Sequence, residues 1–296
     1  LLRDDDLGYK GRHQQCREKP HSLPGYTLEV SGIPGRHFAR NLVERRALVA
    51  QLVRRDFELR YKGSAAGALW GVIHPLVMLA TWVLVFQFFL KVPAPDGEKS
   101  YALFVFVGYL PWSLFQDTVL RSSGSLVEQS NLLTKTVFPA EMVPLSIFFS
   151  SLLQHLIGVA LAIAAIVEVL GYFSLHLLWL PIYMLFIGML GVGLGWIAAS
   201  LHVYLRDTVQ VVAVGLQVWF WITPVMISES QIPERFRLLV RLNPLSRVTA
   251  AYRAHLLHGV PPSFKQLAVL AAYATVVFVL GGLFFRYMKR GFADVL

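Results

Sequence analysis

The chain has 296 residues, of which 55% are hydrophobic and only 15% are charged, whereas a soluble domain carries about 25% charged residues. This balance excludes an ordinary soluble protein and predicts an integral membrane protein, and the excess of 27 basic over 18 acidic residues indicates contact with membrane lipid rather than nucleic acid. The one cysteine, Cys16, excludes a disulfide framework and a cysteine-ligated metal site.

The N-terminal region divides into a polar part and a helical part. Residues 1–38 are polar and interrupted by prolines and glycines, so we expect a peripheral N-terminal extension there. Residues 39–62 have apolar side chains on one arc of a helix and charged side chains opposite, which predicts an amphipathic helix lying in the lipid interface. The acid-before-base pairs within this segment, four residues apart, would support the helix: Glu58 with Lys62 and Asp56 with Arg60.

Six apolar segments follow, each close to the ~20 residues that cross the hydrocarbon core of a bilayer. We therefore predict an all-α membrane domain over residues 63–296, with transmembrane helices at about 69–90, 101–120, 144–170, 177–205, 208–227 and 267–285. Six spans put both termini on one side of the membrane, and 19 of the 27 basic residues fall on that side. Because lysine and arginine favour the cytoplasmic side, both termini are predicted to be cytoplasmic.

The segment after the second span predicts a docking element. Ser125 and Glu128 have the spacing of a capping box, so we expect a short helix to begin at Ser125 and to end before Pro139. A helix held at the cytoplasmic face would form a docking surface for a soluble partner. An ordinary structured loop is the alternative.

The segment between the fifth and sixth spans, residues 228–264, mixes leucines with arginines and is broken at Asn243 and Pro244. This pattern predicts two short helices that dip back into the membrane from outside, the second containing Tyr252 and Arg253. Irregular backbone at membrane depth is tolerated where protein buries it or where it lines a cavity.

Few polar side chains interrupt the spans. Asp117 lies near the predicted end of its span, where a carboxylate reaches water easily, so we do not expect it to form a site. His155 lies in mid-span and is the stronger functional candidate. A hydrogen bond to a neighbouring helix would also account for His155.

Aromatic residues are concentrated in the first two spans, with eleven between Leu69 and Leu120. Aromatic girdles at the lipid interface explain some of them, but three of them share one face well inside a span. Stacking on sugar rings would explain that face, and packing against lipid is the alternative. The candidates for a substrate path are therefore Trp82, Phe86, Phe89, Tyr109, Trp112 and Trp219.

Several motifs of catalysis are absent from the sequence. It contains no phosphate-binding loop of the form GxxxxGK[ST], no HExxH and no GxSxG. If the protein moves a substrate with the energy of ATP, another chain must hydrolyse the ATP. We accordingly expect no catalytic residue, metal or cofactor in this chain, which would not be an enzyme by itself.

Six ordered motifs within residues 39–296 resemble those of one known family, the permease subunits of ABC-2 type exporters of lipid-linked polysaccharide, which include the O-antigen and teichoic-acid exporters. The motifs are RRDFELRYKGSAAGALWGVIHPL (Arg54–Leu76), GYLPWSLF (Gly108–Phe115), SNLLTKTVFPAEMVPL (Ser130–Leu145), YLRDTVQVV (Tyr204–Val212), ITPVM (Ile222–Met226) and NPLSRVTAAYRAHLLHG (Asn243–Gly259).

The resemblance implies a homodimer in the cytoplasmic (inner) membrane of a bacterium, with two copies of a nucleotide-binding ABC ATPase that bind ATP and Mg. It implies that the amphipathic helix and the 121–143 loop dock on that ATPase. The docking candidates are Arg54, Arg55, Asp56, Ser125, Glu128, Leu132 and Leu133. It also implies that the short outer helices close the exit, and the outer-gate candidates are Asn243, Pro244, Tyr252 and Arg253.

The resemblance further implies a substrate, which the residue pattern does not give. That substrate is an undecaprenyl-diphosphate-linked polysaccharide, such as the O-antigen of lipopolysaccharide or a teichoic acid. Export of a small hydrophobic drug is an alternative within transport. A membrane-embedded enzyme that modifies glycans is a further alternative, but the acidic and histidine residues of the spans are scattered.

Overall fold

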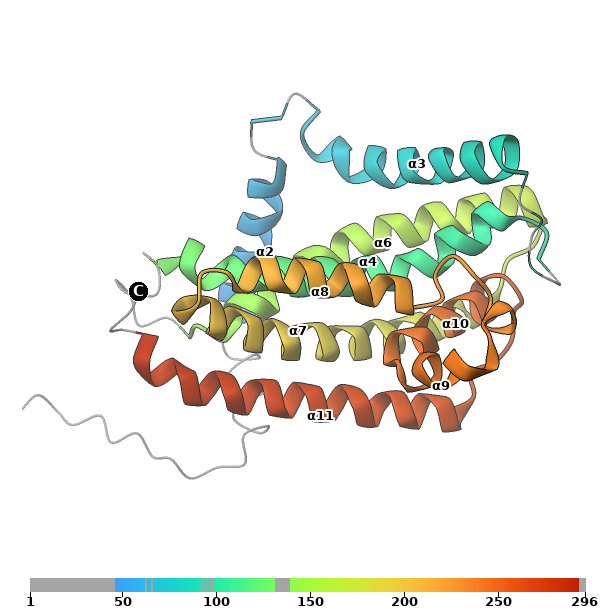
Figure 1. Cartoon of the computed structure of the whole chain (residues 1–296). Helices are drawn as coiled ribbons and strands as arrows, with labels where there is room; N and C mark the ends of the chain where they lie inside the picture. The colour runs from blue at the N-terminus through green and yellow to red at the C-terminus, as the bar shows by residue number, and fades with distance from the viewer. Residues whose placement is uncertain are drawn as a thin grey trace, which may run out of the picture.

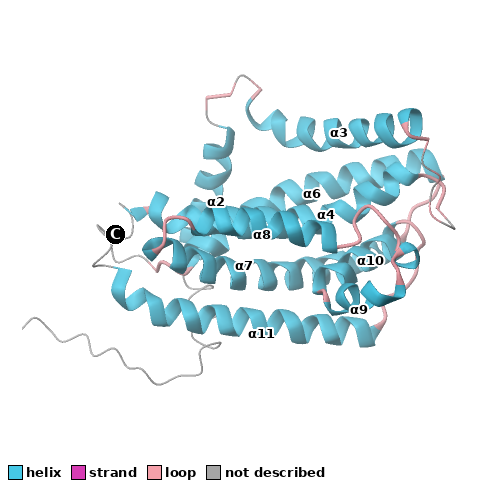
Figure 2. Cartoon of the chain, in the orientation of Figure 1, coloured by secondary structure: helices cyan, strands magenta, loops and turns pink. Residues whose placement is uncertain are grey.

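The protein is described by a computed structural model in which the described residues form helices and their connections, with no strand among them (Figures 1 and 2). The described residues are 46–61, 63–64, 66–91, 93, 95, 98–130 and 139–292. The predicted N-terminal extension, residues 1–38, lies outside them.

Within the described chain, five helical segments are long and apolar enough to cross a membrane. Figure 1 shows them running in a common direction. They are α3 (Trp70–Trp82) with its π-helical continuation η2 (Val83–Phe89), α4 (Tyr101–Glu128), α6 (Met142–Leu170), α7 (Leu180–Tyr204) preceded by η3 (Leu175–Trp179), and α11 (Phe264–Met288) followed by η5 (Lys289–Gly291). These segments correspond to five of the six predicted spans, with shifted ends.

The remaining predicted span is shorter than expected. The helix α8 (Thr208–Ile222) has 15 residues and therefore rises about 22 Å, against about 30 Å for the hydrocarbon core of a bilayer. It ends five residues before the predicted end because Thr223, which precedes Pro224, is extended, with ψ of 128°. The six predicted spans thus correspond, within the described chain, to five long helices and the one short helix α8.

The helix α4 forms the centre of the bundle, packed between α6 and α7, and α7 packs in turn against α11. Glycines on two faces of α7 allow these close approaches. Gly191 and Gly195 face Thr118 and Ser122 of α4, where an added Cβ would lie 3.0 Å and 2.8 Å from those side chains. On the opposite face, a Cβ added to Gly281 of α11 would meet the backbone of α7.

The helix α2 (Arg46–Tyr61) crosses the direction of the long helices (Figure 1). It buries Val49 and Leu52, and its apolar face packs against α6, as the amphipathic pattern predicts. The predicted pairing of Asp56 with Arg60 is wrong, because each of these residues bonds to α4 instead. Glu58 pairs with Arg54, and Lys62 lies outside the described residues.

The two short helices predicted between the last spans are confirmed as α9 (Glu234–Leu242) and α10 (Pro244–Leu256). Asn243 separates them, and its Oδ1 accepts the backbone N–H of Leu245 at 3.0 Å, which caps α10. They lie at the end of the bundle opposite α2 (Figure 1). Their depth in the membrane stays a prediction.

The predicted helix start at Ser125 is wrong. The helix α4 continues through Ser125 to Glu128, and the Ser125 hydroxyl donates to the carbonyl of Ser122 at 2.7 Å within the helix. Ser125 is 1% exposed because small residues here pack closely against neighbouring helices. A side chain so buried offers no docking surface. The remaining part of the predicted element, including Leu132 and Leu133, lies outside the described residues.

Candidate functional site

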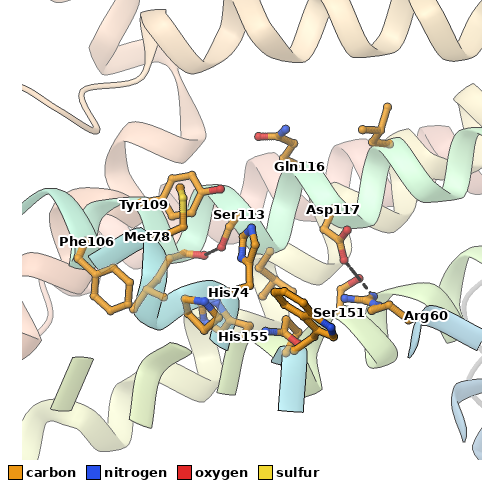
Figure 3. A pocket seen from close by; sticks show the side chains of 16 residues that line it. Arg60, His74, Met78, Phe106, Tyr109, Ser113, Gln116, Asp117, Ser151 and His155 are labelled. Carbon is orange, nitrogen blue, oxygen red and sulfur yellow. Dashed lines mark hydrogen bonds and ion pairs between the residues drawn. The ribbon is translucent and has the colours of Figure 1, made fainter. Parts of the chain in front are cut away.

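A cavity of about 390 Å³ lies between α3, α4 and α6, and the end of α2 closes one side of it (Figure 3). Its wall combines aromatic rings with hydrogen-bonding polar groups, which are the two kinds of side chain that bind sugars through stacking and hydrogen bonds. The rings belong to Trp70, Phe106 and Tyr109, and the polar side chains to Arg60, His74, Ser113, Gln116, Asp117, Ser151, Gln154 and His155.

Asp117 is the centre of the polar wall. Its Oδ2 accepts hydrogen bonds from Arg60 Nη2 of α2 at 3.1 Å and from Ser151 Oγ of α6 at 2.6 Å (Figure 3). One turn further along α4, Arg121 Nη2 donates to Asp56 Oδ1 of α2 at 2.6 Å, and Arg121 Nη1 lies 3.8 Å from Asp117 Oδ2. Two aspartates and two arginines therefore form one neutral network, which we call the Asp117 network.

The Asp117 network explains how the amphipathic helix is fixed to the bundle. Its four side chains are partly buried, between 17% and 36% exposed, so their ion pairs are less screened than pairs at the surface. Both helices have an aspartate four residues before an arginine, and each aspartate pairs across helices in preference to within its own helix. The pairs thus connect α2 to α4, and Ser151 extends the connection to α6.

Asp117 belongs to a site that the sequence does not predict, because the apolar segment of the second span ends near residue 120. The helix α4 continues to Glu128, so the carboxylate lies along the helix and not at its end. The repeated spacing of aspartate and arginine in residues 56–60 and 117–121 is the signal that could have identified the network.

His155, the intramembrane candidate, is 4% exposed. Its Nε2 lies 3.0 Å from the hydroxyl of Tyr252, so it connects α6 to α10. The structure therefore shows the expected alternative, a hydrogen bond to a neighbouring helix. His155 also borders the cavity around Asp117, at the end away from Arg60 (Figure 3).

The aromatic candidates do not form one surface. Trp82 is buried edge-on against Tyr109, with ring centroids 5.0 Å apart, and Phe86 packs on Tyr101 at 4.9 Å. Phe89 is 71% exposed. The prediction that these three residues share one face assumes α-helical spacing. Val83–Phe89 is π-helical, which changes the angle between successive side chains, so the three rings do not line up.

The candidates on the other spans also differ in their surroundings. Trp112 is 1% exposed and packs on Phe220, whereas the partly buried Trp219 packs on Phe115 at 5.2 Å. Of the aromatic candidates, Tyr109 borders the cavity around Asp117. The role of these rings in a substrate path stays a prediction.

The outer-gate candidates hold the segment that follows α8. Arg253 donates from Nε to the carbonyl of Phe104 at 3.1 Å, from Nη1 to that of Pro224 at 2.9 Å and from Nη2 to that of Val225. Its guanidinium carbon lies 3.5 Å from the centroid of the Phe104 ring. Asn243 bonds to Trp219 and Thr223 at the end of α8.

The remaining outer-gate candidates, Pro244 and Tyr252, are sequence neighbours of Asn243 and Arg253. Tyr252 is fully buried, and Pro244 is the first residue of α10. Asn243 and Arg253 thus connect the end of α8 and the segment after it to α10 and to the start of α4, whereas Tyr252 bonds to His155 of α6.

The docking candidates of α2 point in two directions. Arg54 and Arg55 are exposed, and Arg54 pairs with Glu58, which is also exposed, at 2.7 Å. Asp56 points toward α4 and joins the Asp117 network. Glu128 is exposed at the end of α4. Among these candidates, the exposed side chains are available to a soluble partner.

The comparison with known families decides the class of the protein. The family model described as ABC-2 type transporter matches residues 47–257, from the first turn of α2 to the residue after α10. The chain belongs to the ABC-2 type transporter family. The matched range of this ABC-2 protein contains both the Asp117 network and the outer-gate candidates.

Curated relatives of this ABC-2 protein include the O-antigen export system permease protein RfbA of Klebsiella pneumoniae, 27% identical over 84% of the chain and 95% of the relative. The protein of the same name from Myxococcus xanthus is 28% identical over 86% of the chain and 97% of the relative. The polysialic acid transport protein KpsM of Escherichia coli is 24% identical over 80% of the chain and 92% of the relative.

Proposed function

We propose that this protein is the permease subunit of an ATP-driven exporter that moves a polysaccharide across the membrane. The observation that carries the proposal is the match over 95% to 97% of the length of two O-antigen export permeases, because nearly the whole of each of those proteins has a counterpart here. The apolar helices of the described chain and the absence of a phosphate-binding loop from the sequence fit a permease that depends on a separate ATPase.

We propose further that the substrate is a glycan linked to undecaprenyl diphosphate. The cavity around Asp117 supports this part, since it combines aromatic rings with hydrogen-bonding side chains beside the helical segment α3–η2, which exposes several large apolar residues. A glycan on a lipid carrier needs both surfaces at once, one for the sugar and one for the chain of the lipid.

The proposed complex contains two copies of this chain and two copies of a nucleotide-binding ABC ATPase. The exposed Arg54 and Arg55 of α2 and Glu128 of α4 are the proposed contacts with the ATPase. The Asp117 network would then transmit a movement of α2 to α4 and α6, because its ion pairs join all three helices.

The test is reconstitution with a defined substrate. The chain is isolated from its native membrane with its co-purifying ATPase and placed in proteoliposomes that contain an undecaprenyl-diphosphate-linked glycan. The expected result is ATP-dependent transfer of the glycan to the far leaflet, measured by its loss of access to an added glycosidase. Liposomes that lack ATP, and liposomes with a hydrolysis-deficient ATPase, are the controls.

A second assay follows a hydrophobic dye in the same liposomes. Dye transport without glycan transfer would replace the proposal with drug export. Chemical change of the glycan without ATP would replace it with an enzymatic function.

A further inference from the structure

A second cavity, of about 460 Å³, lies at the end of the bundle where α4 begins. Its wall comes from α9 and α10, from the segment after α8 and from the connection that precedes α4. It shares no lining residue with the cavity around Asp117. On the predicted topology this end of the bundle faces the outside of the cell.

The charges of this cavity do not balance among the described residues. Three arginines and two glutamates line it: Arg241, Arg247, Arg253, Glu98 and Glu229. Glu229 Oε1 accepts from Arg241 Nε at 3.2 Å, and Glu98 Oε1 lies 3.0 Å from Nε2 of His258. In the part of the chain that the structure describes, no carboxylate pairs with Arg247 or Arg253. No ion pair therefore neutralises either of these two guanidinium groups, and the three arginines of the cavity exceed its two glutamates by one charge.

Two hydrogen-bonding groups at the same cavity also lack partners. Ser246 is 6% exposed, and its Oγ has no hydrogen-bond partner among the described residues. The same holds for the buried Nε of Arg247. The Nη2 of Arg247 donates to the carbonyl of Arg241 at 2.8 Å, which fixes the guanidinium while its Nε–H remains unused. Because buried polar groups are nearly always bonded, a ligand in this cavity would supply the hydrogen-bond partners that these two adjacent residues lack.

We infer that this cavity binds an oxyanion, either a phosphate or a carboxylate group, through Arg247 and Ser246. An oxyanion accepts several hydrogen bonds at once and compensates an unpaired guanidinium, and charge-assisted bonds of this kind are short and strong. Arg253 contributes charge, while three backbone carbonyls hold its side chain in place. The volume falls within the roughly 300 to 1,000 Å³ of small-molecule sites.

The oxyanion has two possible sources, a phospholipid headgroup and a soluble acidic compound such as an acidic sugar. Three probes distinguish them: inorganic phosphate, glucuronate and phosphatidylglycerol. The full chain is purified with its native partners in dodecyl maltoside, a detergent without phosphate. Binding of radiolabelled phosphate or glucuronate is measured by equilibrium dialysis, and bound phosphatidylglycerol is counted by native mass spectrometry.

The variants are Arg247→Gln and Ser246→Ala, with Arg235→Gln as the control. Arg235 is an exposed arginine of α9 that does not line the cavity. We expect Arg247→Gln to weaken binding of at least one probe tenfold or more, and Ser246→Ala to weaken it severalfold, while Arg235→Gln binds as the unaltered chain does. Ser246→Ala removes no bond of the described structure, so loss of folding does not explain its effect.

If phosphate or glucuronate binding depends on Arg247, the result supports the inference with a soluble compound as the ligand. If phosphatidylglycerol binding depends on Arg247 and neither soluble probe binds, the result supports the inference with a lipid headgroup as the ligand. The inference is overturned if none of the three probes binds the unaltered chain more tightly than it binds the Arg247→Gln variant. The assay involves no transport, so its outcome is separate from that of the proposed function.

Discussion

At the scale of single residues, Arg253 shows how an irregular segment is stabilised inside an apolar protein. Because α8 ends early, the carbonyls of Pro224 and Val225 lie outside any helix, and a buried carbonyl without a donor is costly. Arg253 satisfies both of them and that of Phe104 with one side chain. Gly108 leaves the room for it, since a Cβ at that position would meet the guanidinium.

Replacement of this side chain tests its role. We expect Arg253→Met to lower the free energy of unfolding by about 3 kcal/mol, because three carbonyls lose charge-assisted donors while the volume is largely kept. The exposed Arg235→Met is the matched control, with an expected change within about 0.5 kcal/mol. Unfolding in mixed micelles of increasing SDS content measures both. Equal stabilities of the two variants would contradict the assignment.

The aromatic rings of η2 and α3 permit a second test at this scale. Phe89 is 71% exposed, so Phe89→Ala should leave assembly unchanged and, if the ring borders the substrate path, lower glycan export per complex severalfold. Trp82→Ala, at a ring that is 8% exposed, should instead lower the amount of assembled complex. Normal export per complex in Phe89→Ala would remove this residue from the path.

At the scale of helices, the Asp117 network joins α2, α4 and α6, and its proposed role in transmitting movement can be tested by changing its charges. A single neutralising change leaves a partly buried arginine without its partner, whereas exchange of the two charges restores the pair. We expect Asp117→Asn to lower ATP-driven export about tenfold or more with the complex still assembled. We expect the double variant Arg60→Asp with Asp117→Arg to recover part of that loss.

Lys289→Gln, which breaks the ion pair between Lys289 at the end of α11 and Glu141 at the start of α6, is the control and should export normally. Export and ATP hydrolysis are measured together on the same liposomes. If Asp117→Asn exports normally, the network only holds the helices in place and transmits no movement between them.

The helices also show what the sequence can and cannot predict. The long apolar segments, the amphipathic face of α2 and the two short helices at Asn243 follow from composition and period, because burial and lipid select residues by polarity. The extension of α4 past residue 120 does not follow from composition and period. The serines there, Ser122 and Ser125, are typical of a loop, yet both pack inside the protein. The partners of Asp56 and Arg60 depend on the approach of another helix, which local spacing does not encode.

At the scale of the whole molecule, the predicted orientation decides which side of the membrane each site faces. It rests on the 19 of 27 basic residues that fall on the side of the termini. It would place the cavity around Asp117 toward the cytoplasm and the cavity at Arg247 toward the outside.

Labelling of cysteines tests this orientation. Cys16 should be protected from an impermeant thiol reagent in whole cells and react after the membrane is opened. A Ser230→Cys substitution, made at an exposed residue beside α9, should react in whole cells when Cys16 is replaced by serine. Labelling of Cys16 but not of the cysteine at position 230 in intact cells would reverse the assignment.

The shortness of α8 has a consequence for the surrounding bilayer. A helix that rises about 22 Å does not match a hydrocarbon core of about 30 Å, and its exposed face carries the apolar side chains of Val211, Val214 and Val218. Where this face meets lipid, one way to accommodate the mismatch is for the two leaflets to approach each other, at an elastic cost of fractions of a kcal/mol per Å. A membrane thinned in this way would shorten the apolar distance that a polar headgroup has to cross, and would thereby lower the barrier to a passage beside α8.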